Sequence, residues 1–402
     1  MKLLALSHSL SDVDGVGRYG TEILRRVAPH CSQVRVLLAR KHRGVSERVP
    51  SSVEVEVALP PDYFLYMGWP KFALEYVLRM PRIRAAAREA DVVHCLSDYP
   101  HALLAVNAAR SAGKPVIVSG HGTYSVAPFR YAGHRRLIRS AYQRADAVLM
   151  GSGFALERLR AVCDLPNSRV VHYGVDPEQF EGARSLPRSP KAPRRYVLTI
   201  GELKERKGHH LSIPAFLSIA ARHPDVDLVI VGRTVDGDPY FEARRAEIRA
   251  AGCESRVHFV GLVSEDEKLA LLAHADVFLL TPVTSSEGGF EAFGLVFLEA
   301  NICNVPTVGI KDSGAQDAIR DGETGFLAEK GDVAGVGRAL DALLRDAALR
   351  ERLGRAGAAF ARSLDWDHAG DQILDLYSAV LRKPNAPNAP NVPNVPNVMN
   401  SR

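Results

Sequence analysis

Two glutamates enclose a short apolar stretch, Glu291-Ala-Phe-Gly-Leu-Val-Phe-Leu-Glu299, which follows a strand-like run at 276–282 and a loop with two glycines. A helix beginning near Gly294 has free backbone N–H groups at the positive end of its dipole, where anions bind. No capping Ser, Thr, Asp or Asn precedes Leu295, so a phosphate could take that place. The two carboxylates would flank this phosphate and bind hydroxyl groups, which predicts a sugar-nucleotide site. The alternative is an amphipathic helix with Glu299 on its solvent face.

Two adjacent cations, Arg206 and Lys207, lie in the run Gly201-Glu-Leu-Lys-Glu-Arg-Lys-Gly208, between an expected strand and an expected helix. This order places them at the carboxyl edge of a sheet. A nucleoside diphosphate gains negative charge as its bond to the sugar breaks, and without a metal Arg and Lys must stabilise that charge. The run is also compatible with a solvated basic turn.

Glycines mark two further sites after expected strands. Gly17, in Gly15-Val-Gly-Arg18, would let the backbone approach a phosphate, although a tight turn explains it equally well. The third glycine of a dinucleotide fingerprint is absent, which argues against NAD. His121, between two glycines, is expected at a cleft, as a substrate ligand or as a turn residue. Asp236-Gly-Asp238 matches a metal–nucleotide motif but is interpreted as a surface turn.

Length and composition indicate a two-domain globular protein of 402 residues, 46% hydrophobic and 24% charged. The net charge of +5 suits an anionic small ligand or an acidic membrane surface and is too small to indicate nucleic acid. Five scattered cysteines predict neither a disulfide framework nor a zinc site, and they favour a reducing compartment. The first apolar stretch is too short for a signal peptide and no run is long enough to span a membrane, so we expect a cytoplasmic protein.

Short apolar runs alternate with helical patterns, which predicts an α/β protein with two doubly wound parallel sheets. Strands are expected at 3–6, 34–38, 92–94, 116–119, 147–150, 170–172, 196–200, 227–231, 257–260, 277–280, 307–309 and 325–328. A Pro- and Arg-rich linker at 183–195 separates domains 1–182 and 196–365. Ligands are expected at the carboxyl ends of the strands, in the cleft between the domains. The Pro-Asn repeats of 384–402 predict an extended or disordered tail.

One region of the first domain combines aromatic and basic side chains. The aromatic residues are Tyr63, Phe64, Tyr66, Trp69, Phe72 and Tyr76, and the arginines are Arg130, Arg135, Arg136, Arg139 and Arg144. This combination suits a domain resting on an anionic membrane, or an acceptor pocket. Ordinary packing beside a solvated arginine face is the alternative.

The ordered motifs resemble those of the retaining GT-B glycosyltransferases of group 1, which include bacterial mannosyl- and glucosyltransferases. The resemblance extends to about residue 382. Its motifs are Gly15-Val-Gly-Arg, His121-Gly-Thr, Ala145-Asp-Ala-Val, Gly174-Val-Asp176, Arg206-Lys-Gly208, Glu-x7-Glu, Asp321-Gly-Glu-Thr-Gly-Phe-Leu327 and Trp366.

The resemblance implies a GT-B fold, in which two Rossmann-like domains face each other across a cleft. Domain 1–182 would bind the acceptor, domain 196–365 would bind the donor, and a last helix at 366–383 would cross back to the first domain. Glu291 would contact the donor sugar, Glu299 the ribose, and His121 the transferred sugar. The diphosphate would be held by Arg206, Lys207 and backbone N–H groups at Gly17, Gly294, Leu295 and Val296.

The implied reaction moves a hexose, with retained configuration, from a nucleoside-diphosphate sugar to a hydroxyl of a glycan or lipid-linked acceptor. Neither a metal nor another cofactor is implied. GDP-mannose is the first expectation for the donor, because the sequence Phe-Gly-Leu-Val-Phe-Leu-Glu-Ala, which contains Glu299, resembles that of mannosyltransferases. Peripheral contact with the inner face of an anionic membrane is expected, and nucleic acid is not.

Three positions depart from the family pattern: Glu202 replaces a frequent Arg, Asn304 a usual Gly, and Gly314-Ala315 a Gly-Gly pair. The departure at Glu202 leaves open a non-catalytic protein that binds sugar nucleotides or glycans. A nucleotide-sugar epimerase is the third alternative.

Overall fold

The computed structural model describes residues 1–12, 14–40, 44–61 and 68–382. The predictions for Tyr63, Phe64 and Tyr66, and for the tail from 384 onward, lie outside these residues. Within the described ranges, none of the helices combines the length and the apolar character that a bilayer span requires.

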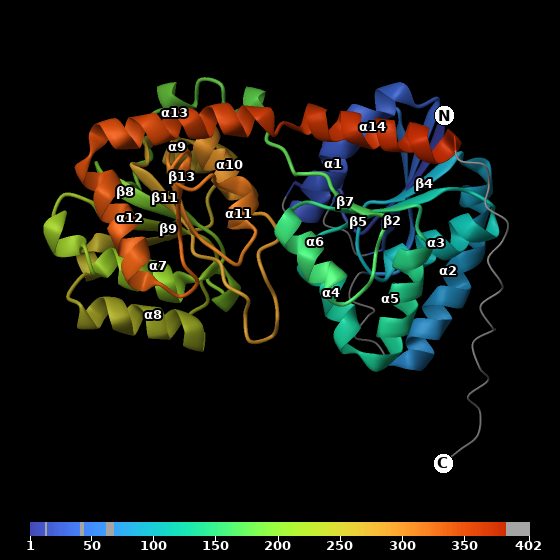
Figure 1. Ribbon diagram of the computed structural model, residues 1–402, viewed down its shortest axis with the longest axis horizontal. Coiled ribbons are helices and arrows are strands. Elements are labelled where there is room, and N and C mark those ends of the chain that lie inside the picture. The colour runs from blue at the N-terminus through green and yellow to red at the C-terminus, as the bar shows by residue number, and fades with distance from the viewer. Residues whose placement is uncertain (13, 41–43, 62–67, 383–402) are drawn as a thin grey trace, which may run out of the picture.

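Two parallel sheets organise the chain, as Figure 1 shows. The first has the order β3-β2-β1-β4-β5-β6-β7 and the second the order β10-β9-β8-β11-β12-β13. The first set of strands is β1 (Lys2–Ser7), β2 (Gln33–Ala39), β3 (Val53–Leu59), β4 (Val92–Cys95), β5 (Val116–Gly120), β6 (Ala147–Met150) and β7 (Ser168–Val170). The second is β8 (Tyr196–Ile200), β9 (Asp227–Val231), β10 (Val257–Gly261), β11 (Val277–Leu279), β12 (Thr307–Ile310) and β13 (Gly325–Ala328).

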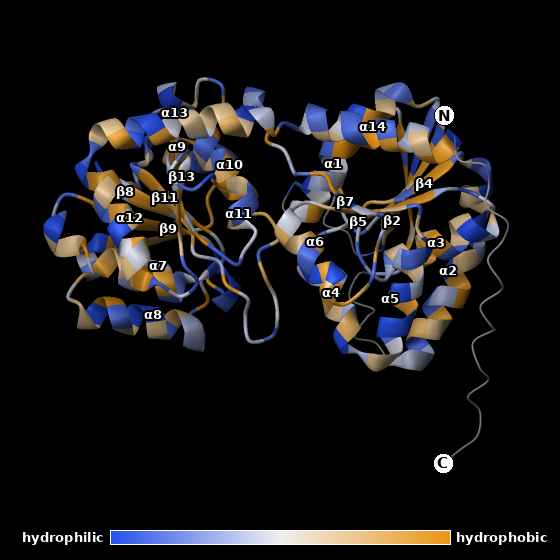
Figure 2. Cartoon of the chain, viewed as in Figure 1, coloured by the Kyte–Doolittle hydropathy of each residue, from blue (hydrophilic) through white to orange (hydrophobic). Residues whose placement is uncertain are grey.

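Helices cover both faces of the sheets, so the central strands are buried and largely apolar, as Figure 2 shows. This arrangement confirms the predicted α/β class with two Rossmann-like halves. The helices are α1 (Gly15–Val27), α2 (Trp69–Glu89), α3 (His101–Ser111), α4 (Thr123–Val126), α5 (Ala132–Arg144), α6 (Gly153–Arg160), α7 (His209–Leu217), α8 (Pro239–Ala250), α9 (Glu265–His274), α10 (Leu295–Ile302), α11 (Ala315–Ala318), α12 (Val333–Arg345), α13 (Ala347–Ser363) and α14 (Trp366–Arg382).

Strands β6, β8, β9 and β13 have the bounds that the apolar runs predict. The strand predicted at 170–172 lies earlier in the structure, where β7 ends at Val170. Val171 is buried beyond the strand, and its N–H donates to Met150 O. Strand β3 was not predicted. Its Val-Glu-Val-Glu-Val alternation has half-exposed positions, because β3 is an edge strand paired only with β2.

The chain passes between the two halves at two places that lie side by side. Val175 N–H bonds to Leu364 O at 2.9 Å, and a side chain at Gly174 would overlap the backbone of residues 365 and 366. Beyond this crossing α14 runs along α1 of the first half (Figure 1). Tyr377 of α14 is fully buried there, with its hydroxyl 2.7 Å from His94 Nδ1. The last described helix therefore completes the core of the first half.

Candidate active site

The Glu291 carboxylate lies in the loop between β11 and α10 and contacts both predicted cations. Its Oε2 accepts from Lys207 Nζ at 2.6 Å and from Arg206 Nη1 at 3.0 Å. Burial opposes ionisation of Glu291, but the charges of Lys207 and Arg206 outweigh burial and lower its pKa below the ordinary 4.5. The carboxylate is therefore ionised. Two cations share one acid, which leaves positive charge available for an anion.

The turn after β8 explains why Lys207 reaches this position. Gly208 has φ +75° and packs so closely on Thr281 that a side chain would overlap Thr281 O. Thr281 Oγ1 in turn donates to Gly208 O at 2.7 Å. The aliphatic part of Lys207 passes close to the α-carbon of Gly201, at the end of β8. The lysine is thus held along the sheet edge and is only 13% exposed, so the interpretation as a solvated turn does not apply to it.

The start of α10 lies beside this ion pair. Gly294 adopts a left-handed conformation, with φ 84°, and among the described residues no side chain caps the helix, as expected from the sequence. A side chain at Gly294 would press on the Phe297 ring at 2.8 Å. The first helical residues, Leu295 and Val296, are half-buried. Their N–H groups are at the positive end of the helix dipole, and Glu291, which contacts Lys207 and Arg206, packs near Gly294 at the same helix start. Cations and free N–H groups together suit a phosphate.

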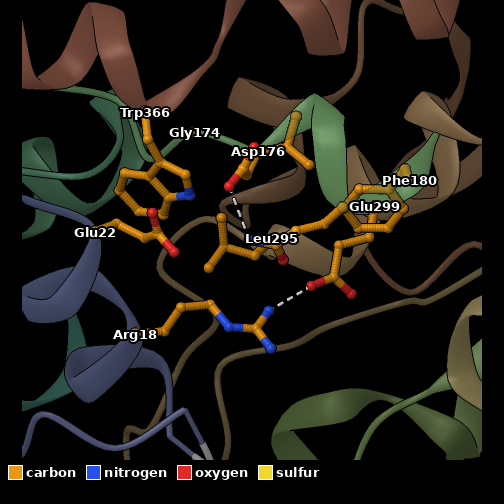
Figure 3. Close-up of a pocket in the computed structure, with 10 residues that line it drawn as sticks. Arg18, Glu22, Gly174, Asp176, Phe180, Leu295, Glu299 and Trp366 are labelled. Atoms are coloured by element: carbon orange, nitrogen blue, oxygen red, sulfur yellow. Dashed lines mark hydrogen bonds and ion pairs between the residues drawn. The ribbon is translucent and has the colours of Figure 1, made fainter. Parts of the chain in front are cut away.

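Glu299 is buried, not on a solvent-facing side of α10: its side chain is 5% exposed. Its Oε1 accepts from Arg18 Nη1 at 2.5 Å, and Oε2 lies 3.4 Å from Lys268 Nζ. Burial opposes ionisation, but Lys268 and Arg18 together lower the pKa of Glu299. Figure 3 shows Arg18 and Glu299 pointing toward each other across a small pocket that Leu295 and Trp366 also line. The pocket lies between α1 of the first half and α10 of the second.

The His121 ring is held on both nitrogens. Nε2 donates to Leu96 O at 2.9 Å, and Nδ1, 2.6 Å from Tyr173 Oη, accepts from that hydroxyl. Burial lowers the pKa of His121 to about 4, so the ring is neutral. Its backbone N–H contacts the Asp98 carboxylate at 3.1 Å. A contact between His121 and a transferred sugar stays a prediction, and the ring would have to exchange one of these partners to make it.

Gly17 occupies a tight turn. Its N–H donates to Asp14 Oδ1 at 2.7 Å, because Asp14 caps α1. A side chain at Gly17 would overlap the backbone of Ser11. A phosphate at this N–H would have to displace the Asp14 carboxylate, so the geometry favours the turn interpretation of this glycine.

Several polar residues of the site carry no signal in the sequence that identifies them. Lys268 reaches Glu299 from α9, which the fold brings beside α10. Arg18 belongs to a recognised motif, but its partner is in the other half of the chain. Asp98 is buried after β4, bonds to Ser125 and His121, and has its pKa raised to about 6 by burial.

The remaining polar motifs have structural partners. Asp238 caps α8 by accepting from Phe241 N–H at 3.0 Å, so the D-x-D run is a helix start. Glu202 forms an ion pair with Lys204 at 3.0 Å, whereas Lys207 donates to Glu291. Across the described ranges, no group of three or more His, Cys, Asp and Glu side chains is arranged to hold a metal ion.

Comparison with known proteins agrees with this architecture. The crystal structure of Anabaena Alr3699/HepE in complex with UDP superposes with a TM-score of 0.76 at 21% identity, covering 94% of this chain and 100% of that one. The chain thus has the GT-B fold of two Rossmann-like halves. The family model "Glycosyl transferases group 1" matches residues 186–360, and "Glycosyltransferase Family 4" matches residues 13–179.

Two curated relatives are mannosyltransferases. The GDP-mannose-dependent alpha-(1-6)-phosphatidylinositol monomannoside mannosyltransferase of Mycolicibacterium smegmatis is 30% identical over 69% of this chain and 74% of its own length. The phosphatidyl-myo-inositol mannosyltransferase of Mycobacterium leprae is 28% identical over 90% of this chain and 95% of its own length. The chain belongs to the group-1 glycosyltransferases, as its motifs indicate, and it is a glycosyltransferase.

The ion pairs of Glu299 predict a pH-dependent contribution to stability. Because the pKa of Glu299 is lower than 4.5 in the folded protein, its charge stabilises the fold above about pH 4.5 and loses that effect as the pH falls through the folded pKa. Glu299→Gln should therefore lower the free energy of unfolding by about 1–3 kcal/mol near neutral pH, and by progressively less below about pH 4.

Urea unfolding of both proteins from about pH 7 to about pH 3 measures this difference. Glu323→Gln, at an exposed position, gives the baseline. A difference between wild type and Glu299→Gln that stays constant over the whole range would contradict the ion-pair assignment.

Proposed function

We propose that this glycosyltransferase transfers a hexose from a nucleoside-diphosphate sugar to an acceptor hydroxyl, with retained configuration and without a metal. The observation that carries the proposal is the convergence of Lys207 and Arg206 on Glu291, beside the uncapped start of α10. A diphosphate needs cations and N–H donors, and a sugar needs a carboxylate that accepts from its hydroxyls. These three kinds of group lie together here.

In this proposal the donor lies along the carboxyl edge of the second sheet. Lys207, Arg206 and the N–H groups of Leu295 and Val296 hold the diphosphate, and Glu291 turns its carboxylate to the sugar hydroxyls. Glu299 accepts from the ribose hydroxyls in exchange for part of its bonding to Arg18. Each acid therefore already sits beside the cations that keep it ionised, and an ionised carboxylate accepts hydrogen bonds strongly.

The reaction proposed for this site follows a same-face path. The bond from the sugar C1 to the phosphate oxygen breaks, and the acceptor oxygen bonds to C1 on the same face. The acceptor proton passes to the departing phosphate oxygen. No protein nucleophile is needed, so the protein contributes orientation and stabilisation of the charge on the leaving diphosphate.

GDP-mannose is the proposed donor and a lipid-linked hydroxyl compound the proposed acceptor. Support comes from the M. smegmatis relative, whose name specifies a GDP-mannose-dependent enzyme that acts on a phosphatidylinositol monomannoside. The alternatives, a non-catalytic binding protein and an epimerase, differ in their products. Donor incubated alone changes its sugar only if the protein is an epimerase, and acceptor plus donor gives no product if it only binds.

A panel of sugar nucleotides tests the donor. A ligand that binds only the native state stabilises it by about 2.7 kcal/mol at a concentration of 100 Kd, so GDP-mannose should raise Tm more than UDP-glucose, UDP-N-acetylglucosamine or ADP-glucose. Thermal denaturation measures the shifts, and transfer to a phosphatidylinositol acceptor measures product. A larger shift with a uridine donor would reject GDP-mannose while leaving the transfer reaction in place.

Removal of the lysine charge tests the catalytic assignment. Lys207→Ala should lower kcat about 10²–10³-fold, because the charge that Lys207 stabilises develops only as the bond breaks. Lys204→Ala, in the same turn but 59% exposed, is the matched control and should keep most of the activity. Steady-state kinetics at saturating donor measures kcat of both variants. An unchanged kcat in Lys207→Ala would remove Lys207 from the mechanism.

Peripheral contact with an anionic membrane is also proposed, through α2 and α5. Leu74, Val77 and Leu78 of α2 are 57–64% exposed, although they are spaced as one helical face. Trp69 at the start of α2 stacks on His134 of α5, with ring centroids 4.6 Å apart, and the next residues of α5, Arg135 and Arg136, are exposed. Apolar and basic groups together suit an anionic bilayer surface.

Replacement of Leu74 and Val77 by Ser should reduce sedimentation with vesicles that contain phosphatidylglycerol. The matched control is Leu262→Ser, since Leu262 is 75% exposed in the other half of the chain. Equal sedimentation of both variants would reject this surface as the membrane contact.

A further inference from the structure

The loop that carries Glu291 is held from the opposite half of the chain. The Thr123 hydroxyl, at the start of α4, donates to Phe290 O at 3.0 Å and accepts from Phe290 N–H at 2.9 Å. One side chain thereby occupies both backbone groups of the residue that precedes Glu291. Thr123 belongs to the His121-Gly-Thr motif, in which the sequence predicts a role for the histidine only.

Further contacts hold the loop on the other side of Glu291, at Ala292. The Ser152 hydroxyl, before α6, donates to Ala292 O. Gly122 has φ +80°, and a side chain there would overlap the Ala292 Cβ. Within the second half, Gly314 N–H donates to Glu291 O at 3.0 Å. Residues 290, 291 and 292 are each fixed by a different element, and two of those elements lie in the first half.

We propose that Thr123 and Gly122 are positioning residues for the transfer reaction, since they align Glu291 only when the first half docks against the second. This inference rests on the proposed function. The proposed diphosphate ligands Lys207 and Arg206 belong to the second half, whereas the Thr123 hydroxyl bonds to the backbone of Phe290. The sugar site is then complete only when the two halves are docked, which ties the positioning of the donor sugar to the contact between them.

The separation of roles predicts a specific kinetic pattern. Thr123→Val keeps the shape of the side chain but removes both hydrogen bonds to Phe290. We expect kcat to fall about 10–100-fold, because small misplacement of a positioning group is costly. The donor Kd, measured by calorimetry, should change less than about threefold. Thr123→Ser keeps the hydroxyl and should recover most of the lost kcat, which a loss of packing alone would not explain.

A control of the same kind lies in the same loop. Thr284 Oγ1 accepts from Arg158 of the first half at 3.1 Å, but Arg158 also pairs with Asp312, and Thr284 does not flank Glu291. Thr284→Val should therefore leave kcat within about twofold of wild type. Gly122→Ala, which keeps the Thr123 hydroxyl but pushes on Ala292, should lower kcat as Thr123→Val does.

Amide hydrogen exchange provides a readout that needs no activity. Thr123 Oγ1 protects the Phe290 N–H, so Thr123→Val should raise exchange in a peptide spanning residues 284–293, while Thr284→Val should not raise it at Phe290. Unchanged exchange, unchanged kcat, or equal losses of kcat and donor affinity would each overturn the inference. Absence of transfer by the wild type would instead reject the proposed function, and the exchange result would still decide whether Thr123 holds the loop.

Discussion

The buried ion pair between Lys207 and Glu291 is the constraint on which the rest of the site depends. A charge removed from water is costly unless a partner compensates it, so each of these groups requires the other while no ligand is bound. The Gly208 turn, the Thr281 contact and the Gly314 bond to Glu291 all serve to bring the two charges together. A ligand that enters must therefore replace these interactions with comparably strong ones.

The contacts between the two halves are both polar and apolar: Phe290 packs on Phe154, and Phe293 packs on Tyr173. Arg18 bonds to Glu299, Thr123 to Phe290, and Asp317 accepts from Gly153 N–H at 2.7 Å at the start of α6. These polar groups can bond to water when the halves separate, whereas the buried aromatic contacts of Phe290 and Phe293 oppose opening. The pair of crossing segments near Val175 and Leu364 remains as the covalent connection.

Much of the fold follows from local patterns, because buried parallel strands are continuous apolar runs and both sheets are made of them. The edge strand β3 does not fit this pattern, because glutamates alternate with its valines and Val55 and Val57 are themselves exposed. In the site, Glu291, Lys207 and the uncapped start of α10 have local signals: a charge after a strand, or a glycine before a helix. Lys268 has no such signal, and the motifs that contain Arg18 and Thr123 do not predict their partners. Those partners are distant in sequence, and only the packing of helices and halves brings them together. Gly17 was expected at a phosphate because glycine permits close approach to the backbone, but a tight turn also requires glycine. In the structure the Gly17 N–H donates to Asp14.

The position of α14 has a consequence for biosynthesis. The strands of the first sheet leave the ribosome long before α14 does, and domains generally begin to fold as they emerge. Until residues 366–382 are made, the nascent first half lacks the side chains of Ile373, Tyr377 and Val380, which are buried in the finished protein. His94, buried with Tyr377 as its neighbour, would meanwhile lie beneath an uncovered apolar surface. Chaperone occupancy of the growing chain should therefore persist at that surface until translation has passed the last turn of α14.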